Sequence, residues 1–238
     1  MSGIRSTDIR STGIRAALFS LPLVLGLLGT AAAPAGAVGS HAPHVPHAPH
    51  ASHPSHASHP GKSLTCRGKG VDPDALVRHR TGTVINAPLR TIWKLQADVE
   101  RWPSWQAPIE TVERLDHGPL RKGSAFRWTT PIPPNPSTPA TSLEITSTVQ
   151  QIKRNSCIRW TGPAIGEGLR IEGVHVWKFT KVKGGVRVTT EETHTGAQVE
   201  ADVPTATKIL REGLEAWLRD LKSAAEARAD NRYLQGHA

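Results

Sequence analysis

Apolar residues follow two different periods in the part of the chain after residue 80. Six segments alternate apolar and polar residues, as is typical of β-strands, and turn-forming residues separate them. These predicted strands are residues 109–116, 124–130, 141–153, 157–162, 168–182 and 185–196. A further short strand is predicted from Thr81 to Asn86. Two short helices should follow it, at 88–99 and 100–107, with Asn86 able to cap the first.

A long amphipathic helix is predicted in residues 204–228, near the C-terminal end of the chain. Its apolar residues recur at i, i+3, i+4 and i+7, which places them in one stripe. The stripe consists of Ile209, Leu210, Gly213, Leu214, Trp217, Leu218, Leu221, Ala224 and Ala225. The predicted order is one strand, two short helices, six strands and one long helix, so the expected fold class is α+β.

Three local features accompany this order of elements. Asn86-Ala87-Pro88 begins the first helix, Asp98 precedes the Trp102-Pro103-Ser104-Trp105 turn, and the last strand reads GGVRVTTEETHTG. Together with the element order, they resemble the START-like polyketide cyclase/dehydrase proteins, also called SRPBCC proteins, of the birch-pollen-allergen superfamily. The resemblance covers about residues 81–228.

The resemblance implies a helix-grip fold, in which a seven-stranded antiparallel sheet curls around the C-terminal helix and leaves an apolar cavity. Members of the family bind lipids, polyketides, hormones or other hydrophobic molecules, and some cyclise or aromatise polyketides. The family has no universal catalytic motif. The resemblance therefore predicts a cavity for a hydrophobic small molecule, and no particular reaction.

The segment 183–186, Lys-Gly-Gly-Val, predicts a hairpin with Gly184-Gly185 as its two-residue turn. The opposed pairs in this register are Phe179 with Thr190, Trp177 with Glu192, and His175 with His194. The alternation of apolar residues places the same side chains on one face of each strand. We therefore expect His175, Glu192 and His194 to lie together on the concave side of the sheet.

Four interpretations of these three residues stay open at this stage. They can form a hydrogen-bonded polar patch, or orient a ligand in an otherwise apolar pocket. As catalytic candidates, they can perform acid–base chemistry on an enolisable, polyketide-like substrate. They can also hold zinc or copper, although no further residue that would orient such ligands is evident.

The other candidate ligand-binding residues are mostly aromatic. Trp128, Trp160 and Trp177 alternate in phase with apolar neighbours, and Trp217 lies on the helix stripe, so each can be core or cavity wall. Gly213 costs about 1 kcal/mol of helix propensity; it either leaves room for a cavity or allows close helix–sheet packing. The predicted ligand-binding set is Trp128, Trp160, His175, Trp177, Phe179, Thr190, Glu192, His194, Gly213 and Trp217.

The N-terminal segment 1–37 has the pattern of a secretory signal peptide. Arg5, Arg10 and Arg15 precede an apolar run of about 18 residues, and Ala35-Gly36-Ala37 provides a small-residue cleavage site. An uncleaved membrane anchor is the alternative, because a run of this length can almost span a bilayer. No later segment is long and apolar enough to do so. We expect a secreted or cell-envelope-associated protein without a membrane span after cleavage.

Residues 38–61 form a linker in which a histidine recurs at every third position. Its prolines disfavour a helix, and the polyproline II conformation would place the imidazoles about 9 Å apart along one face. Such spacing cannot form a closed metal site, so only weak or adventitious binding of Zn, Cu or Ni is expected, and no cofactor. The weak metal candidates are His41, His44, His47, His50, His53, His56 and His59.

The chain has two cysteines, Cys66 and Cys157, and a formal net charge of +9. In an exported protein two cysteines more often pair than stay free, so we expect the disulfide Cys66–Cys157. The lysines and arginines are scattered rather than clustered, and no nucleic-acid-binding motif is present, so a nucleic-acid partner is not expected.

The predicted organisation has five parts: a signal peptide (1–37), the linker (38–61), an N-terminal extension (62–80), a START-like domain (81–229) and a flexible tail (230–238). The favoured function is that of an exported carrier or sensor of a hydrophobic small molecule. A cyclase or aromatase-like enzyme using His175, His194 and Glu192 is the first alternative. A metal-handling protein acting through the histidine tract is the second. The sequence does not indicate the oligomeric state.

Overall fold

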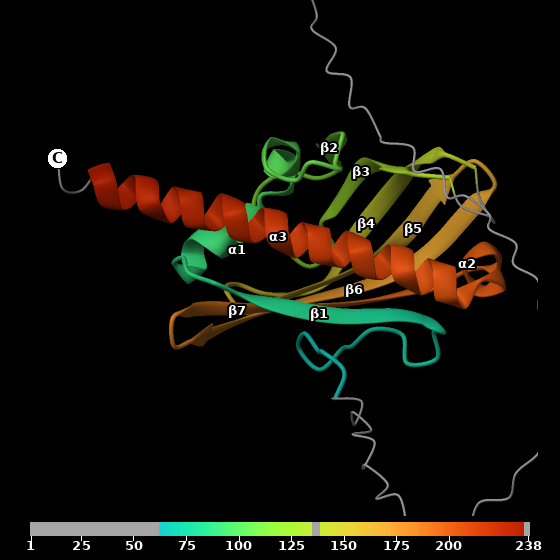
Figure 1. Cartoon of the computed structure of the whole chain (residues 1–238), viewed down its shortest axis with the longest axis horizontal. Coiled ribbons are helices and arrows are strands. Elements are labelled where there is room, and N and C mark those ends of the chain that lie inside the picture. The colour runs from blue at the N-terminus through green and yellow to red at the C-terminus, as the bar shows by residue number, and fades with distance from the viewer. Residues whose placement is uncertain (1–61, 135–138, 236–238) are drawn as a thin grey trace, which may run out of the picture. The chain divides into compact units, whose positions relative to one another are not determined.

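A computed structural model describes residues 62–134 and 139–235, and side chains as far as residue 230 (Figure 1). The chain separates into two units, Met1–Ser55 and His56–Ala238, and the described residues belong to the second. The predicted signal peptide, the linker and its seven histidines lie outside the described residues. These three predictions therefore stay predictions.

The core of the fold is a seven-stranded antiparallel sheet, as the sequence predicts. The strands are β1 (Val77–Ile85), β2 (Thr111–Arg114), β3 (Ala125–Ile132), β4 (Thr141–Lys153), β5 (Cys157–Gly166), β6 (Leu169–Val182) and β7 (Gly185–Thr195). They lie in the order β1-β7-β6-β5-β4-β3-β2, so the first strand pairs with the last. The first strand begins at Val77, four residues before the predicted Thr81, because Val77 is still paired with His194.

Four helices accompany the sheet in the described part of the chain. They are α1 (Leu89–Ala97), the 3₁₀ helix η1 (Val99–Ser104), α2 (Ala197–Ala201) and α3 (Val203–Gln235). The two predicted short helices and the long C-terminal helix are confirmed, whereas α2 was not expected. The long helix α3 crosses one face of the sheet, and α1 with η1 lies near its C-terminal half (Figure 1). This arrangement is the expected helix-grip fold.

Polar contacts attach one flank of α3 to β1. The ammonium group of Lys222 donates a 2.8 Å hydrogen bond to the carbonyl oxygen of Val84. The backbone N–H of Asn86 donates to the carboxylate of Glu226, which also pairs with Lys222. The prediction that Asn86 caps α1 is wrong, since Pro88 occupies that position without a side-chain cap. The segment after β1 instead supports α3.

The register of the β6–β7 hairpin differs from the prediction by two residues. Val182 pairs with Gly185, so Lys183 and Gly184 form the turn. His175 therefore faces Glu192, Trp177 faces Thr190 and Phe179 faces Val188, instead of the expected pairs. Gly185 belongs to the strand, where β1 passes so close that a Cβ would collide with the carbonyl oxygen of Ile85. A shift of two residues keeps every side chain on its predicted face.

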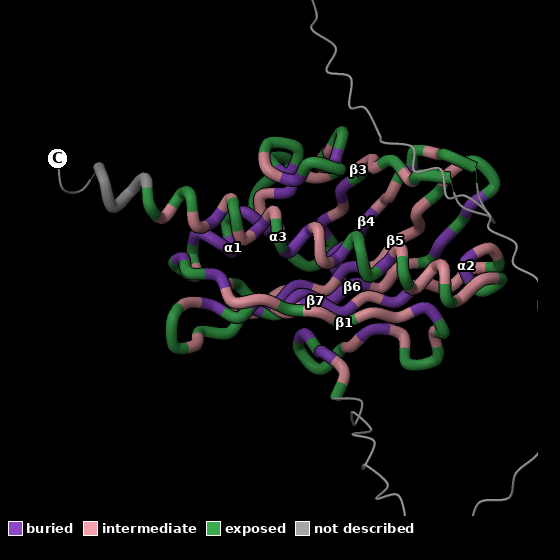
Figure 2. Tube along the Cα trace, viewed as in Figure 1, coloured by how far each residue is buried: buried purple, intermediate pink, exposed green. Residues whose placement is uncertain are grey.

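Buried residues form two clusters between the sheet and α3 (Figure 2). The larger cluster includes Trp102, Trp160, Trp177, Trp217 and Leu221, together with buried residues of α1 and β7. The smaller cluster lies around the first turns of α3, and its members are Val77, Leu143, Leu169, Ile171, Val199, Leu210 and Leu214. The hydrophobic interior under α3 is thus divided along the length of the helix.

A third cluster contains the N-terminal extension and the predicted disulfide. Cys66 and Cys157 are bonded, and their side chains pack with Leu64, Val71 and Val176. The buried carboxylate of Glu191 accepts hydrogen bonds from the Ser63 hydroxyl and the Leu64 N–H. The extension is therefore attached to the folded domain by covalent and polar contacts.

Replacing both cysteines by serine should lower the free energy of unfolding by about 2–4 kcal/mol, because the disulfide closes a loop between residues 91 positions apart. Urea unfolding of the wild type and the double variant measures the difference. A reducing agent should destabilise the wild type and leave the double variant unchanged. Equal stability of the two proteins under oxidising conditions would contradict this role.

Candidate functional site

The larger cluster under α3 is centred on Trp102 of η1, which is fully buried. Its ring centroid lies 4.9 Å from that of Trp217 in α3 and 5.3 Å from that of Phe126 in β3. Trp128 and Trp160 lie at 5.9 Å. The contacts with Trp217, Phe126 and Trp128 are edge-to-face, and such contacts stabilise aromatic clusters beyond the burial of area. Trp102 was not among the predicted site residues, because the Pro103 turn gave no periodicity that could place it.

Gln96 of α1 fixes two of these indoles. The Trp217 indole N–H donates to the Gln96 side-chain oxygen at 3.2 Å, and the Trp102 indole N–H donates to the Gln96 backbone carbonyl at 3.2 Å. Gln96 is fully buried although it is polar. It therefore links α1, η1 and α3 through hydrogen bonds inside the apolar cluster. A lone glutamine within a helical pattern carries no sequence signal for this role.

Six of the predicted ligand-binding residues lie in this cluster or against it and are buried: Trp160, His175, Trp177, Phe179, Thr190 and Trp217. Trp128 is only partly buried, and its indole N–H donates to the Ser147 hydroxyl. The aromatic side chains pack mainly against one another. They form a solid end wall beneath the C-terminal half of α3, and Trp128 lies at its accessible edge.

A chain of polar side chains borders this wall on the helix-facing side of the sheet. The Thr190 hydroxyl and His175 Nε2 are 2.6 Å apart, and His175 Nδ1 is 3.2 Å from a carboxylate oxygen of Glu192. The other Glu192 oxygen is 3.4 Å from Nε2 of His194. The structure thus brings the three predicted polar residues together, in the order His175–Glu192–His194.

Burial lowers the pKa of His175 to about 4, although the nearby carboxylate of Glu192 acts to raise it. The imidazole is therefore neutral at pH 7. Its Nδ1–H faces Glu192, so its Nε2 accepts a hydrogen bond from Thr190. Burial acts to raise the pKa of Glu192, but the contacts with His175 and His194 hold it below the usual value. Glu192 is accordingly a carboxylate, and its side chain keeps 18% of its exposure.

A further imidazole, His79 of β1, lies opposite Glu192 in the sheet. Its Nε2 is 3.8 Å from the carboxylate of Glu215 in α3. The pKa of His79 lies below its ordinary value, mainly because the ring is partly buried. Glu215 acts to raise this pKa, and Arg211 acts to lower it. In residues 62–134 and 139–235, no group of three or more His, Cys, Asp or Glu residues is arranged to hold a metal ion. A metal site at His175, Glu192 and His194 is thus not supported.

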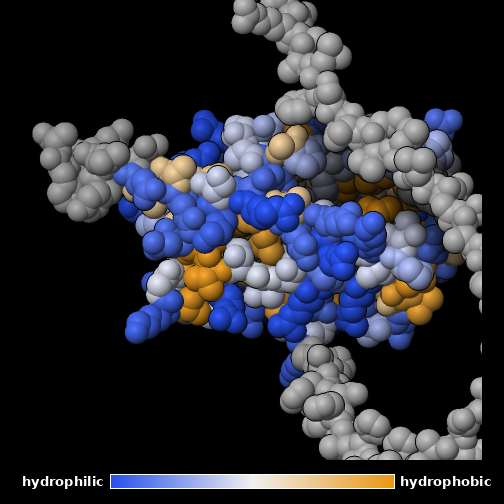
Figure 3. Space-filling view, in the orientation of Figure 1, coloured by the Kyte–Doolittle hydropathy of each residue, from blue (hydrophilic) through white to orange (hydrophobic). Residues whose placement is uncertain are grey.

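The smaller cluster forms the second part of the site, under the N-terminal half of α3. Partly buried apolar side chains pack against it from the strands and from the helix. We call these residues the helix–sheet groove: Ile132, Ile145, Ala164, Val203 and Ala206. Figure 3 shows hydrophobic side chains in a recess beside α3 on this side of the molecule. The groove is therefore apolar and reached by solvent.

Gly213 of α3 is exposed to solvent. A Cβ built on Gly213 would meet no other atom within 4 Å, so the residue faces open space. The opposite flank of α3 carries Glu215 and Lys222, which contact β1. Gly213 therefore points away from β1, toward the side of the sheet where β3–β5 lie. Close helix–sheet packing at this glycine is therefore excluded, and because Gly213 is exposed, the space around it is not an enclosed cavity.

The family profile described as "Polyketide cyclase / dehydrase and lipid transport" matches residues 77–226. No curated protein matches the sequence. Among solved structures, the di-domain aromatase/cyclase StfQ from the steffimycin biosynthetic pathway is 15% identical, with a TM-score of 0.50 over 65% of this chain and 52% of that chain. A START superfamily protein from Mycobacterium smegmatis is also 15% identical, with a TM-score of 0.48 over 65% of this chain and 97% of that chain.

None of the helices in the described ranges combines the length and the apolar character needed to cross a bilayer.

Acid should destabilise the domain through His175. Between pH 6.5 and 4 the unfolded chain binds a proton on this residue that the folded protein does not, so stability rises with pH in this window. The contribution is at most about 3 kcal/mol. It is complete above pH 6.5 and decreases as the pH falls toward 4. Urea unfolding at a series of pH values should show a smaller slope for His175→Gln than for the wild type.

His117→Gln is the matched control, because His117 is exposed. It should keep the wild-type slope. An unchanged slope in His175→Gln would contradict the assignment of a neutral buried imidazole.

Proposed function

Because the chain belongs to the family of polyketide cyclases, dehydrases and lipid-transport proteins, we propose that it binds a hydrophobic small molecule between the sheet and α3. The supporting observation is the apolar, solvent-reached helix–sheet groove under the N-terminal half of α3 (Figure 3). The exposed Gly213, on the flank of α3 away from β1, adds no side chain that would narrow it. A ligand in this groove buries apolar surface, which contributes about 25 cal/mol per Å². Pockets for small molecules combine such apolar walls with a few polar groups.

The neighbouring residues suit distinct parts of such a ligand. Trp128, at the edge of the aromatic wall, offers a flat surface to one end of the molecule. Glu192 and His194 keep about a fifth of their side-chain exposure and can accept or donate one hydrogen bond to a polar group. Gly173 lies beside both, since a Cβ there would be 3.6 Å from a carboxylate oxygen of Glu192 and 3.9 Å from the ring of His194. The ligand is accordingly a lipid, polyketide or aromatic compound with one polar end.

The proposal includes export of the protein. The pattern of residues 1–37 supports cleavage after Ala37, and the Cys66–Cys157 disulfide suits an oxidising compartment. A ligand-binding domain behind a histidine-rich linker would then act outside the cytoplasm as a carrier or sensor.

One observation favours a second candidate, an enzyme of the cyclase or aromatase type. Glu192 is a partly exposed carboxylate paired with two imidazoles, and such a group can remove a proton from an enolisable substrate. Export argues against it, because polyketide synthesis normally takes place in the cytoplasm. We therefore favour the carrier function over the enzyme function.

Gly213→Phe should weaken the binding of an uncharged fluorescent probe, N-phenyl-1-naphthylamine, by about tenfold or more, because the phenyl ring would occupy the open space. Fluorescence titration measures the change. Gly213→Ala is the control. It should keep the affinity and stabilise the domain by up to about 1 kcal/mol through helix propensity. Equal affinities of the wild type and Gly213→Phe would contradict the location of the site.

Glu192→Gln separates the two candidate functions. A carrier should keep its affinity for the uncharged probe within about threefold, since at most one hydrogen bond changes. If the protein is an enzyme, Glu192→Gln should still bind the probe but should no longer convert a polyketide mixture. Mass spectrometry of the products measures the conversion. If the wild type converts the mixture and Glu192→Gln does not, the enzyme function is favoured over the carrier function.

A further inference from the structure

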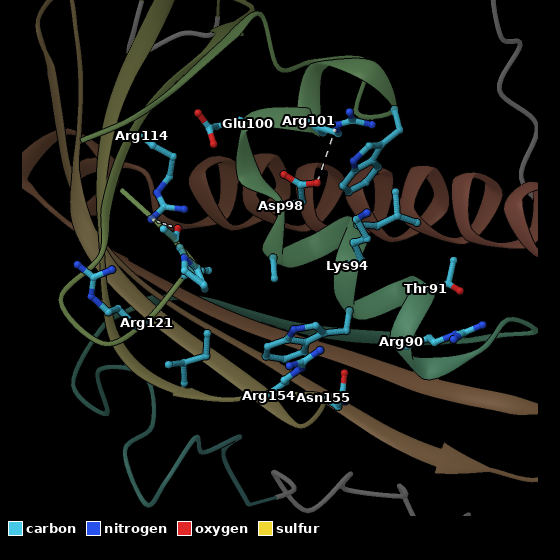
Figure 4. A pocket seen from close by; sticks show the side chains of 18 of the residues that line it. Arg90, Thr91, Lys94, Asp98, Glu100, Arg101, Arg114, Arg121, Arg154 and Asn155 are labelled. Carbon is cyan, nitrogen blue, oxygen red and sulfur yellow. Dashed lines mark hydrogen bonds and ion pairs between the residues drawn. The ribbon is translucent and has the colours of Figure 1, made fainter. Parts of the chain in front are cut away.

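A cavity of about 1140 Å³ lies among α1, η1, the β2–β3 connection and the β4–β5 turn (Figure 4). Trp93 lines it and also packs edge-on against Phe179, at a centroid distance of 5.5 Å. The core therefore backs this cavity. None of the groove residues, nor Gly213, lines it, so it is separate from the proposed ligand site between the sheet and α3.

Basic residues dominate the rim of the cavity. Its lining contains seven basic side chains and two acidic ones. The basic residues are Arg90, Lys94, Arg101, Arg114, Arg121, Arg154 and Arg228. In Figure 4, Arg90, Lys94 and Arg101 come from the helices, whereas Arg114, Arg121 and Arg154 come from the side of the strands. Positive charge from distant parts of the sequence therefore gathers around one space.

Some of these charges are already compensated. Arg114 pairs with Asp116 at 2.8 Å, and Arg121 lies 3.5 Å from the same carboxylate. Arg101 lies 3.9 Å from Asp98. Glu100 is the second acidic residue of the lining.

Three basic residues of the rim, Arg90, Lys94 and Arg154, take part in no ion pair with residues 62–134 or 139–230. All three are exposed. Asn155, with φ of 59°, turns the chain directly after Arg154 at the cavity. These three residues leave a positive charge that the surrounding carboxylates do not neutralise.

Apart from Thr91, Gly118 and Asn155, the remaining lining is apolar. Its members are Trp93, Leu95, Ala97, Trp105, Pro119, Leu120 and Ile152. Inorganic anions gain nothing from such a surface, whereas an alkyl or aromatic group loses contact with water there. A cationic rim above an apolar floor fits a molecule with both characters.

We propose that this cavity is a second binding site, for an amphipathic organic anion. The anionic group lies among Arg90, Lys94 and Arg154, where charge-assisted hydrogen bonds hold it. The apolar part of the molecule lies against Leu120 and Ile152. This site does not depend on the helix–sheet groove, and either can exist without the other.

Calorimetric titration of the full-length protein with decanoate and with 1-decanol tests the proposal. The two probes share an alkyl chain and differ in charge. Lys94→Gln/Arg154→Gln should weaken decanoate binding by about tenfold or more and leave 1-decanol unaffected. Raising the salt concentration should weaken decanoate binding to the wild type, since the rim charges are exposed.

Arg187→Gln/Arg219→Gln is the matched control, because it removes two exposed positive charges away from the cavity. It should bind decanoate as the wild type does, and so should Gly213→Phe. Each of these results would overturn the proposal: no decanoate binding by the wild type, equal affinity of Lys94→Gln/Arg154→Gln and the wild type, or an equal loss in the control. If Gly213→Phe loses decanoate binding and Lys94→Gln/Arg154→Gln does not, the anion binds in the helix–sheet groove, and this result would also overturn the proposal.

Discussion

The contact of Trp217 with Trp102 and Gln96 is the constraint on which the arrangement of this domain depends. It joins the long helix α3 to η1 and α1, and the ring of Trp102 extends the contact to β3 and β5. Each aromatic pair contributes about 0.5–1.5 kcal/mol beyond its burial. Because Gln96 satisfies two indole N–H groups, this large apolar cluster fixes their orientation as well as their position.

The position of the open groove follows from this contact. The C-terminal half of α3 is held over the aromatic cluster, and one flank is held to β1 by Lys222 and Glu226. The N-terminal half then crosses the sheet above smaller residues, and Gly213 leaves space on the flank opposite β1. The polar chain from His175 to His194 lies at the boundary between filled and open regions. The same aromatic cluster thus provides both stability and the end wall of a site.

The sequence predicted the elements well, because strand and helix periods are local properties. The two-residue period placed His175, Glu192 and His194 on one face, and that face is correct even though their register was not. The error arose because two adjacent glycines offered two possible turns. In the structure Gly185 lies in the strand against β1, and that contact joins residues about a hundred positions apart, so the local pattern does not show it.

The parts of the site that the sequence did not reveal have no local signal. Trp102 lies in a short 3₁₀ helix that contains Pro103, and Gln96 is one polar residue in a helix. The basic cavity draws Arg90, Arg121 and Arg154 from three separate elements, so the charges appeared scattered along the chain. Their proximity results from the meeting of the β2–β3 and β4–β5 connections with α1, which periodicity alone does not predict.

Native mass spectrometry of the full-length protein, purified without detergent, tests the central claim most directly. The account predicts a co-purifying hydrophobic molecule that remains bound in the folded protein and is released on mild denaturation. An extract of the released material would identify its class. A protein that is empty after purification, and that takes up no component of a lipid and polyketide extract, would contradict the assignment of a ligand site between the sheet and α3.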